Sequence, residues 1–408
     1  MSIGRQSIGV GGIAGNYLAP VVVAAPDPPI YYADVYSVDL CVGWARVAEA
    51  PAAVFDGVLR NLALGEWRLT GAVDALVFES GWALTDVDTI RVVRNNELVF
   101  AGWVNPLGSG IGGLDVIDGP DGPTFTLSGP DAWDVLNSRV AYPTPATGPP
   151  WANSWDVRTG QASTVAAAYI AANAGSSASA ARQIAGLSVV DGHAGISGSW
   201  SGRLQPLDQL VARVCRDGAI TCRLRVDFAG AVTATLTAPV DRHTTVVISD
   251  QGGLTKIEHT RIPAASTFVI AGGQGLLNAR TFATAGTATG AARREVFTDQ
   301  TSLSTSAEVG QAAGTRLALD ASTLTVRAEL TDLGAAGLVW PFHYDLGDTI
   351  AMEIGDVRYP VTVESVTFHI APDRSVIRPV LGTATPGLVS GLVRDIAGLA
   401  TRLDTQIA

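Results

Sequence analysis

The stretch LDQLVARVCRDGAITCRLRVDFAGAVTATLTA, residues 207–238, contains a helix signal followed directly by a hairpin signal. In its first part, Leu207, Leu210 and Val214 recur at helical spacing, and Gly218 supplies a stop. The next two segments, ITCRLRVD and AVTATLTA, have the composition of strands and flank a short turn. The stretch therefore predicts a helix joined to a β-hairpin, which together make a compact α+β unit.

A second hairpin is predicted upstream, in TIRVVRNNELVFAGWV at residues 89–104. Ile90 and Val92 lie on one face of the first strand, and Asn95 and Asn96 supply the turn. Apolar residues return after the turn, as expected for the second strand of a hairpin. Strands therefore dominate this part of the chain.

Residues 124–140, TFTLSGPDAWDVLNSRV, predict a strand followed by a short helix. Ser128 or Asp131 is expected to cap this helix, and Pro130 is expected in its first turn. The proline-rich segment 142–155 would then end the helix and serve as a connector.

The rest of the chain continues the mixture of helices and strands. Helices are expected at 163–175, where alanines favour them, and at 306–322. Strands are expected at 244–250 and 266–273. Four more strands should follow the second helix and close a barrel-like unit. Their sequences are LTVRAEL, DTIAMEI, RYPVTVESVTFHI and VIRPVLG.

The composition is that of a folded chain with more than one domain. At 408 residues it exceeds the size at which a single core usually stops growing. Hydrophobic residues make up 47% and charged residues 16%, which excludes a disordered protein and suggests that partners cover much of the surface. The net charge of −11 disfavours stable or sequence-specific nucleic-acid binding, because phosphate contacts need clustered cations.

The cysteines and the apolar segments indicate the cellular compartment in which the protein is synthesised. Cys41, Cys215 and Cys222 cannot all pair and fit no zinc pattern, so we expect buried thiols. The first thirty residues contain no apolar run of signal-peptide length. No segment reaches the roughly 18 apolar residues that a transmembrane helix requires. These features indicate synthesis in a reducing cytoplasm.

No stretch carries a complete catalytic, cofactor or metal signal. The acids Asp86 and Asp88, or Asp115 and Asp118, could serve a glycosidase, but aspartates in such turn-rich sequence commonly cap the backbone. The histidines are scattered singly, without HExxH spacing. The glycine-rich segment 271–280 lacks the GxGxxG and GK(S/T) patterns. We therefore predict no enzymatic activity, no cofactor and no metal site.

Two regions are candidates for contacts with other proteins. Trp151 and Trp155 lie in the proline-rich connector, where tryptophan can anchor an interface, stack on sugars or simply pack in a core. The last 20 residues repeat apolar residues in heptads, which fits either a coiled coil or an amphipathic surface helix. The candidate contact residues of this repeat are Val389, Leu392, Ile396, Leu399 and Leu403.

Taken in order, several short segments are similar to the tail-hub family of siphoviruses. The series runs from the stretch quoted first through STFVIAGGQG (266–275) and RREVFTD (293–299) to YDLGDTI (344–350). The upstream segments RVVRNNELVFAGWV and DAWDVLNSRVAYPTP belong to the same series. This family is often described as minor tail proteins or baseplate hubs. It is related in fold to hubs of contractile phages and to the N-terminal regions of type VI secretion spikes.

The resemblance implies a mainly β fold with α+β insertions and a short C-terminal helix. Two tail-tube-like β-barrel domains would lie beside the α+β parts. The expected division is an arm at 1–30, a first barrel at 31–130 with a returning strand near 241–262, an α+β domain at 131–240, a second barrel at 263–385 with an inserted helix near 306–322, and a helix at 386–408.

The implied function is structural, because family hubs form trimeric rings at the tip of the virion tail. Such a ring joins the tail tube to the distal tip and fibre components. The implied partners are the distal tail protein ring, the tape measure protein and other minor tail or fibre proteins. Two alternatives are a carbohydrate-binding receptor-recognition module and a tail-associated cell-wall hydrolase.

Overall fold

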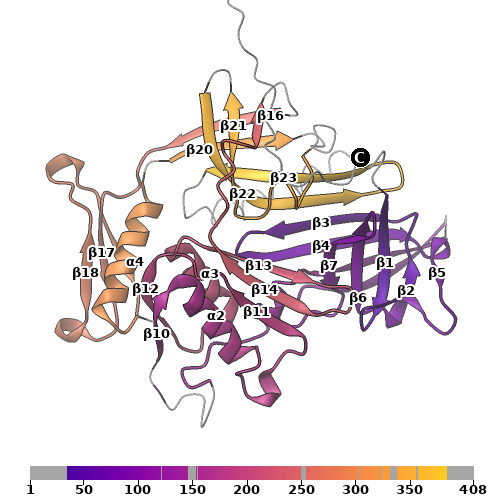
Figure 1. The fold of residues 1–408 in the computed structure, drawn as a ribbon, viewed down its shortest axis with the longest axis horizontal. Coiled ribbons are helices and arrows are strands. Elements are labelled where there is room, and N and C mark those ends of the chain that lie inside the picture. Colours follow the sequence, from indigo (N-terminus) through magenta and orange to yellow (C-terminus); the bar gives the residue numbers. More distant parts are fainter. Residues whose placement is uncertain are drawn as a thin grey trace, which may run out of the picture.

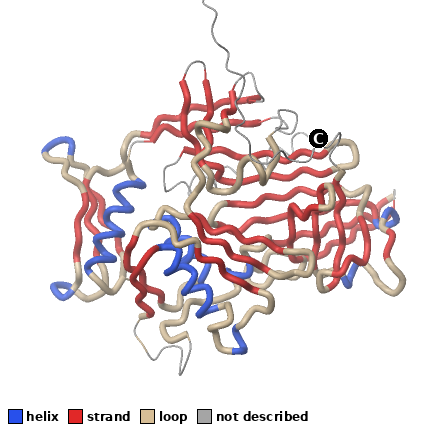
Figure 2. The backbone as a smooth tube through the Cα atoms, viewed as in Figure 1, coloured by secondary structure: helices blue, strands red, loops and turns tan. Residues whose placement is uncertain are grey.

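The computed structural model is mainly β, as the sequence predicts. Figure 1 shows a large strand-rich body with two smaller units beside it, and Figure 2 shows that the longer helices lie in those units. The structure describes residues 35–383, except 121, 146–152, 154, 250–253, 302, 322, 331–337 and 355–356.

The first sheet is antiparallel and has the order β5-β2-β1-β6-β7. The predicted hairpin at 89–104 is confirmed as β6 and β7. Asn95 and Asn96 between them have φ angles of 49° and 68°, the left-handed conformation that a two-residue type I′ turn requires. The strands are β1 (Tyr36–Val42), β2 (Ala45–Glu49), β5 (Val77–Phe78), β6 (Thr89–Arg94) and β7 (Glu97–Trp103).

The second sheet has eight strands, and it takes them from both ends of the described chain. Its order is β15-β21-β22-β3-β4-β9-β8, with β23 also paired to β22. The strands are β3 (Val54–Arg60), β4 (Ala63–Ala72), β8 (Gly113–Gly119), β9 (Gly122–Pro130), β15 (Val247–Ser249), β21 (Thr349–Ile354), β22 (Val357–Ile370) and β23 (Ser375–Thr383).

The pairing of β22 with β3 joins these two ends. It is antiparallel and runs from Ser365 opposite Arg60 to Ile370 opposite Phe55. The side chains of His369 and Asp56, 313 positions apart, add a hydrogen bond of 2.7 Å. Strands from the beginning and the end of the described chain therefore continue one sheet.

One hydrophobic core is shared by the two sheets. Phe55 of β3 contacts Phe100 of β7 edge to face, with ring centres 5.1 Å apart. Phe368 of β22 then contacts both Phe100 and Trp340, each at 5.4 Å. All four rings are buried. Edge-to-face aromatic contacts of this kind add to the stabilisation from burial, so the two sheets form one two-layer body.

The stretch 207–238 folds as predicted, into α3 followed by the hairpin β13–β14. Leu207, Leu210 and Val214 are fully buried, which confirms the apolar stripe of the helix. They pack against α2, which occupies the predicted helix at 163–175. The elements of this first α+β unit are β10 (Asp156–Gln161), α2 (Ala162–Asn173), β11 (Leu187–Asp191), β12 (Ser197–Gly202), α3 (Leu207–Asp217), β13 (Thr221–Val226) and β14 (Val232–Thr237).

A second α+β unit consists of a three-stranded sheet with one helix on it. The helix confirms the prediction at 306–322, and a capping box starts it: Glu308 N–H donates to Thr305 Oγ1, and the Glu308 carboxylate accepts the Thr305 N–H. The elements are β17 (Phe268–Gly272), β18 (Phe282–Ala285), β19 (Glu295–Asp299) and α4 (Ser306–Leu319).

A strand pair and several short helices complete the described fold. Among the described residues, no helix is long and apolar enough to cross a bilayer. The strands are β16 (Leu254–Ile262) and β20 (Thr323–Leu330), which are antiparallel. The short helices are α1 (Asp134–Asn137), η1 (Val73–Ala75), η2 (Leu84–Asp86), η3 (Ala180–Arg182), η4 (Leu277–Ala279) and η5 (Gly290–Ala292).

The two expected barrels are not confirmed, because no sheet of the described strands closes on itself. Strands of the expected second barrel, β21 to β23, instead share a sheet with β3, β4 and β9 of the first. The expected returning strand near 241–262 is divided into β15, beside β21, and β16, beside β20. Sequence periodicity indicates which face of a strand is buried but not which strand lies next to it. The domain boundaries stay a prediction.

The start of α1 also differs from the prediction. Pro130 is the last residue of β9, opposite Glu66, and does not lie in the helix. A strand end tolerates the missing N–H of proline. Asp131, one of the two expected caps, accepts a hydrogen bond from the N–H of Trp133 at 3.0 Å, and the helix begins only at Asp134.

Candidate functional site

Of the sequence-predicted contact residues, the structure describes Trp155. Its indole N–H donates to Gln274 Oε1 at 3.0 Å, and the guanidinium carbon of Arg203 lies 5.6 Å from its ring centre. Gln274 follows β17, so Trp155 connects the two α+β units within one chain. Its contact with another protein stays a prediction. The residues outside the described part are Trp151, Val389, Leu392, Ile396, Leu399, Leu403 and the arm at 1–30.

The paired acids do not form an acid–base site. Asp86 and Asp88 both accept backbone N–H groups in turns, at 2.9 Å and 3.0 Å, as the sequence suggested. Asp115 and Asp118 both lie on β8, three residues apart, so they point to opposite faces of the sheet. Asp86 and Asp88 thus hold turns, and Asp115 and Asp118 do not face a common position.

The cysteines are free and buried, which confirms the expectation for Cys41, Cys215 and Cys222. Burial raises the pKa of Cys41 and of Cys222 to about 12, so these thiols stay protonated and unreactive near neutral pH. Within the described residues, no group of three or more His, Cys, Asp or Glu side chains could hold a metal ion.

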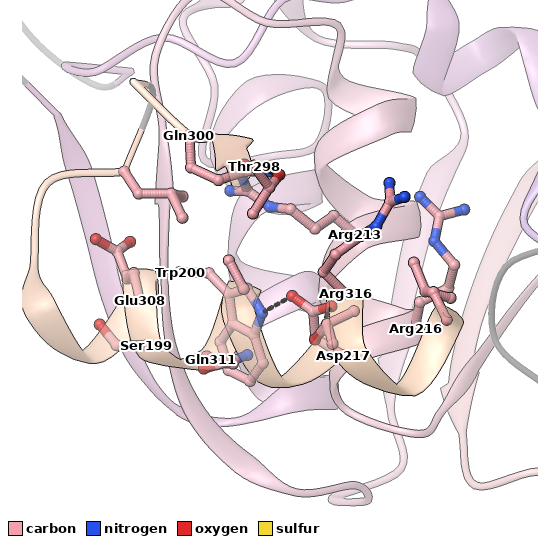
Figure 3. Close-up of a pocket in the computed structure, with 14 residues that line it drawn as sticks. Ser199, Trp200, Arg213, Arg216, Asp217, Thr298, Gln300, Glu308, Gln311 and Arg316 are labelled. Carbon is pink, nitrogen blue, oxygen red and sulfur yellow. Dashed lines mark hydrogen bonds between the residues drawn. The ribbon is translucent and has the colours of Figure 1, made fainter. Parts of the chain in front are cut away.

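A pocket of about 240 Å³ lies where the two α+β units meet (Figure 3). Residues of β12 and α3 form one wall, and residues of β19, α4 and the segment between them form the other. The lining carries both signs of charge and one large aromatic ring. Its principal side chains are Trp200, Arg213, Asp217, Gln300, Glu308 and Arg316.

Asp217 bridges the two units across this pocket. Its carboxylate accepts the indole N–H of Trp200 at 3.2 Å and the hydroxyl of Thr315, from α4, also at 3.2 Å. Burial raises the pKa of Asp217, and the hydrogen bonds from these partners lower it in part. The carboxylate therefore links the units and is not a free acid.

Glu308 and Arg213 are likewise engaged in the structure. Glu308 is 3% exposed, and one of its oxygens accepts the N–H and hydroxyl groups of Ser304 and Thr305 at the start of α4. Arg213 donates to the carbonyl oxygen of Ser201, and burial lowers its pKa. The pocket is thus a polar junction in which Glu308 caps a helix and Arg213 links α3 to β12, while Glu308 Oε1 and Arg213 Nε are buried without a hydrogen-bond partner.

A charged network attaches β13 to the loop before β21. The fully buried Asp348 accepts from Arg223 at 2.6 Å and from Arg242 at 3.0 Å, and also from two backbone N–H groups. Asp345 accepts from Arg225 at 2.7 Å. A buried charge is tolerated where it is paired and fully hydrogen-bonded, so this network holds the first α+β unit on the large sheet.

Asp131 marks a third junction, at the end of β9. Its backbone N–H donates to the carbonyl oxygen of Gly65. Burial raises its pKa to about 7, although hydrogen bonds from Gly65 and Trp133 and the nearby Arg60 act in the opposite direction. A Cβ at position 65 would lie 2.4 Å from Asp131 Oδ2, so this close approach requires glycine.

Comparison with known families identifies this architecture. A family model described as "Siphovirus ReqiPepy6 Gp37-like protein" matches residues 114–383, more than half of the chain. The chain belongs to this family. It is a family of structural phage tail proteins, and the match spans both α+β units and the C-terminal strands of the large sheet.

Solved tail proteins, two of them from prophages, share the fold. The tail protein from Neisseria meningitidis MC58 aligns with a TM-score of 0.52 and 12% identity, over 86% of this chain and 97% of that one. The 43 kDa tail protein of prophage MuSo2 from Shewanella oneidensis gives 0.54 and 11%, over 87% and 99%. Prophage tail protein gp18 from Listeria monocytogenes EGD-e gives 0.51 and 10%, over 90% and 99%. No curated protein matches the chain.

The charged network was not predicted from the sequence, although its residues other than Arg242 lie in two segments that carry the family resemblance, 207–238 and 344–350. Arg223 and Arg225 alternate along a strand whose intervening positions are apolar, and Asp345 and Asp348 lie in the segment YDLGDTI. The alternation of Arg223 with Arg225 and the spacing of Asp345 and Asp348 can each be recognised in the sequence. Their pairing across more than a hundred positions is decided by the packing of β13 on the large sheet.

The charged network should contribute strongly to stability. We expect Asp348→Asn to lower the free energy of unfolding by about 3 kcal/mol, because it leaves the partly buried Arg223 and Arg242 without the counter-charge of a fully buried carboxylate. The matched control is Glu353→Gln, which removes a more exposed pair with Arg358 and should cost less than about 1 kcal/mol. Urea unfolding of both variants measures the difference. Equal free energies of unfolding for the two variants would show that the network does not hold the first α+β unit on the large sheet.

Asp131 should make stability depend on pH. Its folded pKa is raised to about 7, above the ordinary value, so its stabilising effect is complete at low pH and is lost as pH rises through 7. Asp131→Asn cannot titrate. We therefore expect the melting temperature of this variant to rise relative to wild type between about pH 4 and about pH 7 and to stay constant relative to it above that. A constant difference across this range would contradict the raised pKa.

Proposed function

We propose that this chain is the structural hub of a phage tail tip. In this proposal it forms a homotrimeric ring that joins the tail tube to the distal tip and fibre components of the virion. The observation that supports it is membership of a structural tail-protein family, in a fold that covers nearly the full length of three solved tail proteins.

The construction of the chain suits a hub, which has to hold its neighbours in fixed orientations. One core ties the two sheets together, and buried polar contacts attach the smaller units to the body and to each other. Interiors packed in this way are stiff and transmit strain instead of absorbing it. The proposed neighbours are the distal tail protein ring, the tape measure protein and other minor tail or fibre proteins.

The chemistry of the junctions favours a protein without enzymatic turnover. The carboxylates of Asp217, Glu308 and Asp348 each accept hydrogen bonds from protein donors, and burial raises the pKa of all three thiols. Two assays distinguish the alternative functions from that of a hub. A carbohydrate-binding module should bind on a glycan array, and a cell-wall hydrolase should clear peptidoglycan in a zymogram.

The trimeric ring is tested directly in the assembled particle. We expect a reconstruction of the tail tip to show three copies of this chain around the tail axis. Native mass spectrometry of isolated tips should give the same number. One or two copies per particle would contradict the proposal, whereas a monomer in free solution would not, because assembly can require the neighbouring proteins.

The two ends of the chain are proposed as docking elements. We expect deletion of residues 2–25, and separately the double variant Leu392→Asp with Leu399→Asp, to leave folding intact but impair tail assembly. For the double variant, the reason is that aspartate side chains on a packed apolar heptad face are costly to bury. The control, Ser390→Asp with Ala397→Asp, places the same charges off that face. Full infectivity of both test variants would show that neither end docks anything essential.

A further inference from the structure

We propose that the pocket between the two α+β units binds a small neutral ligand with several hydroxyl groups, of the size of a single sugar ring. Neither unit forms this pocket alone, because β12 and α3 supply one wall and β19, α4 and the segment between them supply the other. The inference does not rest on the proposed hub, since a hub can carry such a site or lack it.

The size of the pocket limits the ligand. Its volume is about 240 Å³. A water molecule occupies about 30 Å³ in the liquid, so the pocket has room for several waters or for one small organic molecule. Sites for drug-sized ligands are larger, at roughly 300–1,000 Å³. The pocket therefore suits one ring and not a chain of rings.

Two side chains of the lining each keep one buried polar atom without a hydrogen-bond partner. These atoms are Glu308 Oε1 and Arg213 Nε. Glu308 is 3% exposed, and its other oxygen already accepts from Ser304 and Thr305. Arg213 already donates through Nη2 to the carbonyl oxygen of Ser201. Buried polar groups of native proteins nearly always have a partner, so these two atoms indicate what a ligand has to offer.

Hydroxyl groups satisfy both of these atoms. A carboxylate oxygen only accepts hydrogen bonds and a guanidinium N–H only donates them, so the ligand has to supply one donor and one acceptor. A hydroxyl group does both, whereas an ammonium group supplies donors alone and a carboxylate or phosphate group supplies acceptors alone. A ligand with several hydroxyl groups therefore matches Glu308 and Arg213 together.

The charge of the lining is balanced, which favours a neutral ligand. Three arginines and two acids line the pocket. One of the arginines, Arg316, pairs at 3.0 Å with Asp320, which lies outside the lining. A charged ligand would find no excess of the opposite charge here to offset the loss of its hydration. The two cations and two acids that balance each other are Arg213, Arg216, Asp217 and Glu308.

An aromatic ring forms a fixed part of the wall. Trp200 is 2% exposed, and its indole N–H donates to Asp217 at 3.2 Å, so the ring is in place before a ligand binds. Figure 3 shows this ring among the side chains of α3 and α4 that line the pocket. A Cβ at Gly198 would lie 2.7 Å from the Trp200 ring and 2.8 Å from Gln311 Oε1, so glycine makes room for both side chains. Ligand sites commonly combine such apolar surface with a few placed polar groups.

Ligand-detected NMR with the full chain tests the site. The test sugars are glucose, galactose, mannose and N-acetylglucosamine at millimolar concentration. The amino sugar and the uronic acid related to each serve as charged counterparts of similar size. We expect at least one neutral sugar to bind, and its charged counterparts to bind about tenfold more weakly, because the pocket offers no net charge to either.

Two variants test whether the bound sugar lies in the pocket. Glu308→Gln keeps an oxygen for the helix cap but replaces the free oxygen by an amide donor, and Ala312→Leu fills the pocket from α4. We expect each variant to weaken binding by about tenfold or more. The matched control is Ala318→Leu, on the same helix but outside the lining, which should leave binding unchanged. Melting temperatures show which variants are folded.

Three results would overturn the inference. One is that no neutral sugar of the set binds, which would leave water alone as the partner of Glu308 and Arg213. Another is that a charged counterpart binds as tightly as the neutral sugar. The third is binding that persists in a folded Glu308→Gln or Ala312→Leu variant, because the sugar would then lie elsewhere on the chain.

A glycan array with the same variants distinguishes the two sources of such a ligand. Loss of array binding in the variants would identify the ligand as the terminal ring of a longer glycan, whereas binding of free sugars alone would identify a small metabolite. Both outcomes support the site. None of these measurements depends on the number of copies in the tail tip, so this inference and the proposed hub can fail separately.

Discussion

The antiparallel pairing of β22 with β3 is the constraint on which the rest of the structure depends. It joins strands that lie more than 300 positions apart, and it sets Phe368 against Phe100 and Trp340 in the shared core. Without it, the N-terminal and C-terminal strands would belong to separate sheets. Contacts this distant in sequence close a long loop and therefore form at high entropic cost, which the burial of four aromatic rings helps to offset.

Buried polar contacts then set the positions of the smaller units. The first unit is held by arginines of β13 on Asp348, and the second is linked to the first by Asp217. Such contacts are directional, because a buried carboxylate is tolerated only when its hydrogen-bond donors are in place. In a chain with only 16% charged residues, these few charges therefore determine how the units are oriented.

This arrangement leaves two kinds of surface facing outward. One is the edge strand β8, and the other is the side of the small sheet β18-β17-β19 on which Arg280 lies near the rings of Phe282 and Phe297. Both are carried by elements anchored to cores, so their geometry is set before assembly. A hub that joins other proteins needs such preformed surfaces, because flexible ones would lose entropy at every contact.

The sequence by itself determined the local elements and the class of protein. The stripe of Leu207, Leu210 and Val214 predicted α3, and Asn95 with Asn96 predicted the turn of a hairpin, because helix periodicity and turn geometry depend on neighbouring residues. The order of short motifs predicted the family. Only the tertiary structure decided that the expected barrels share an open sheet and that Arg223 meets Asp348. Strand order and ion pairing depend on which distant surfaces pack together, and no periodicity within a segment records that.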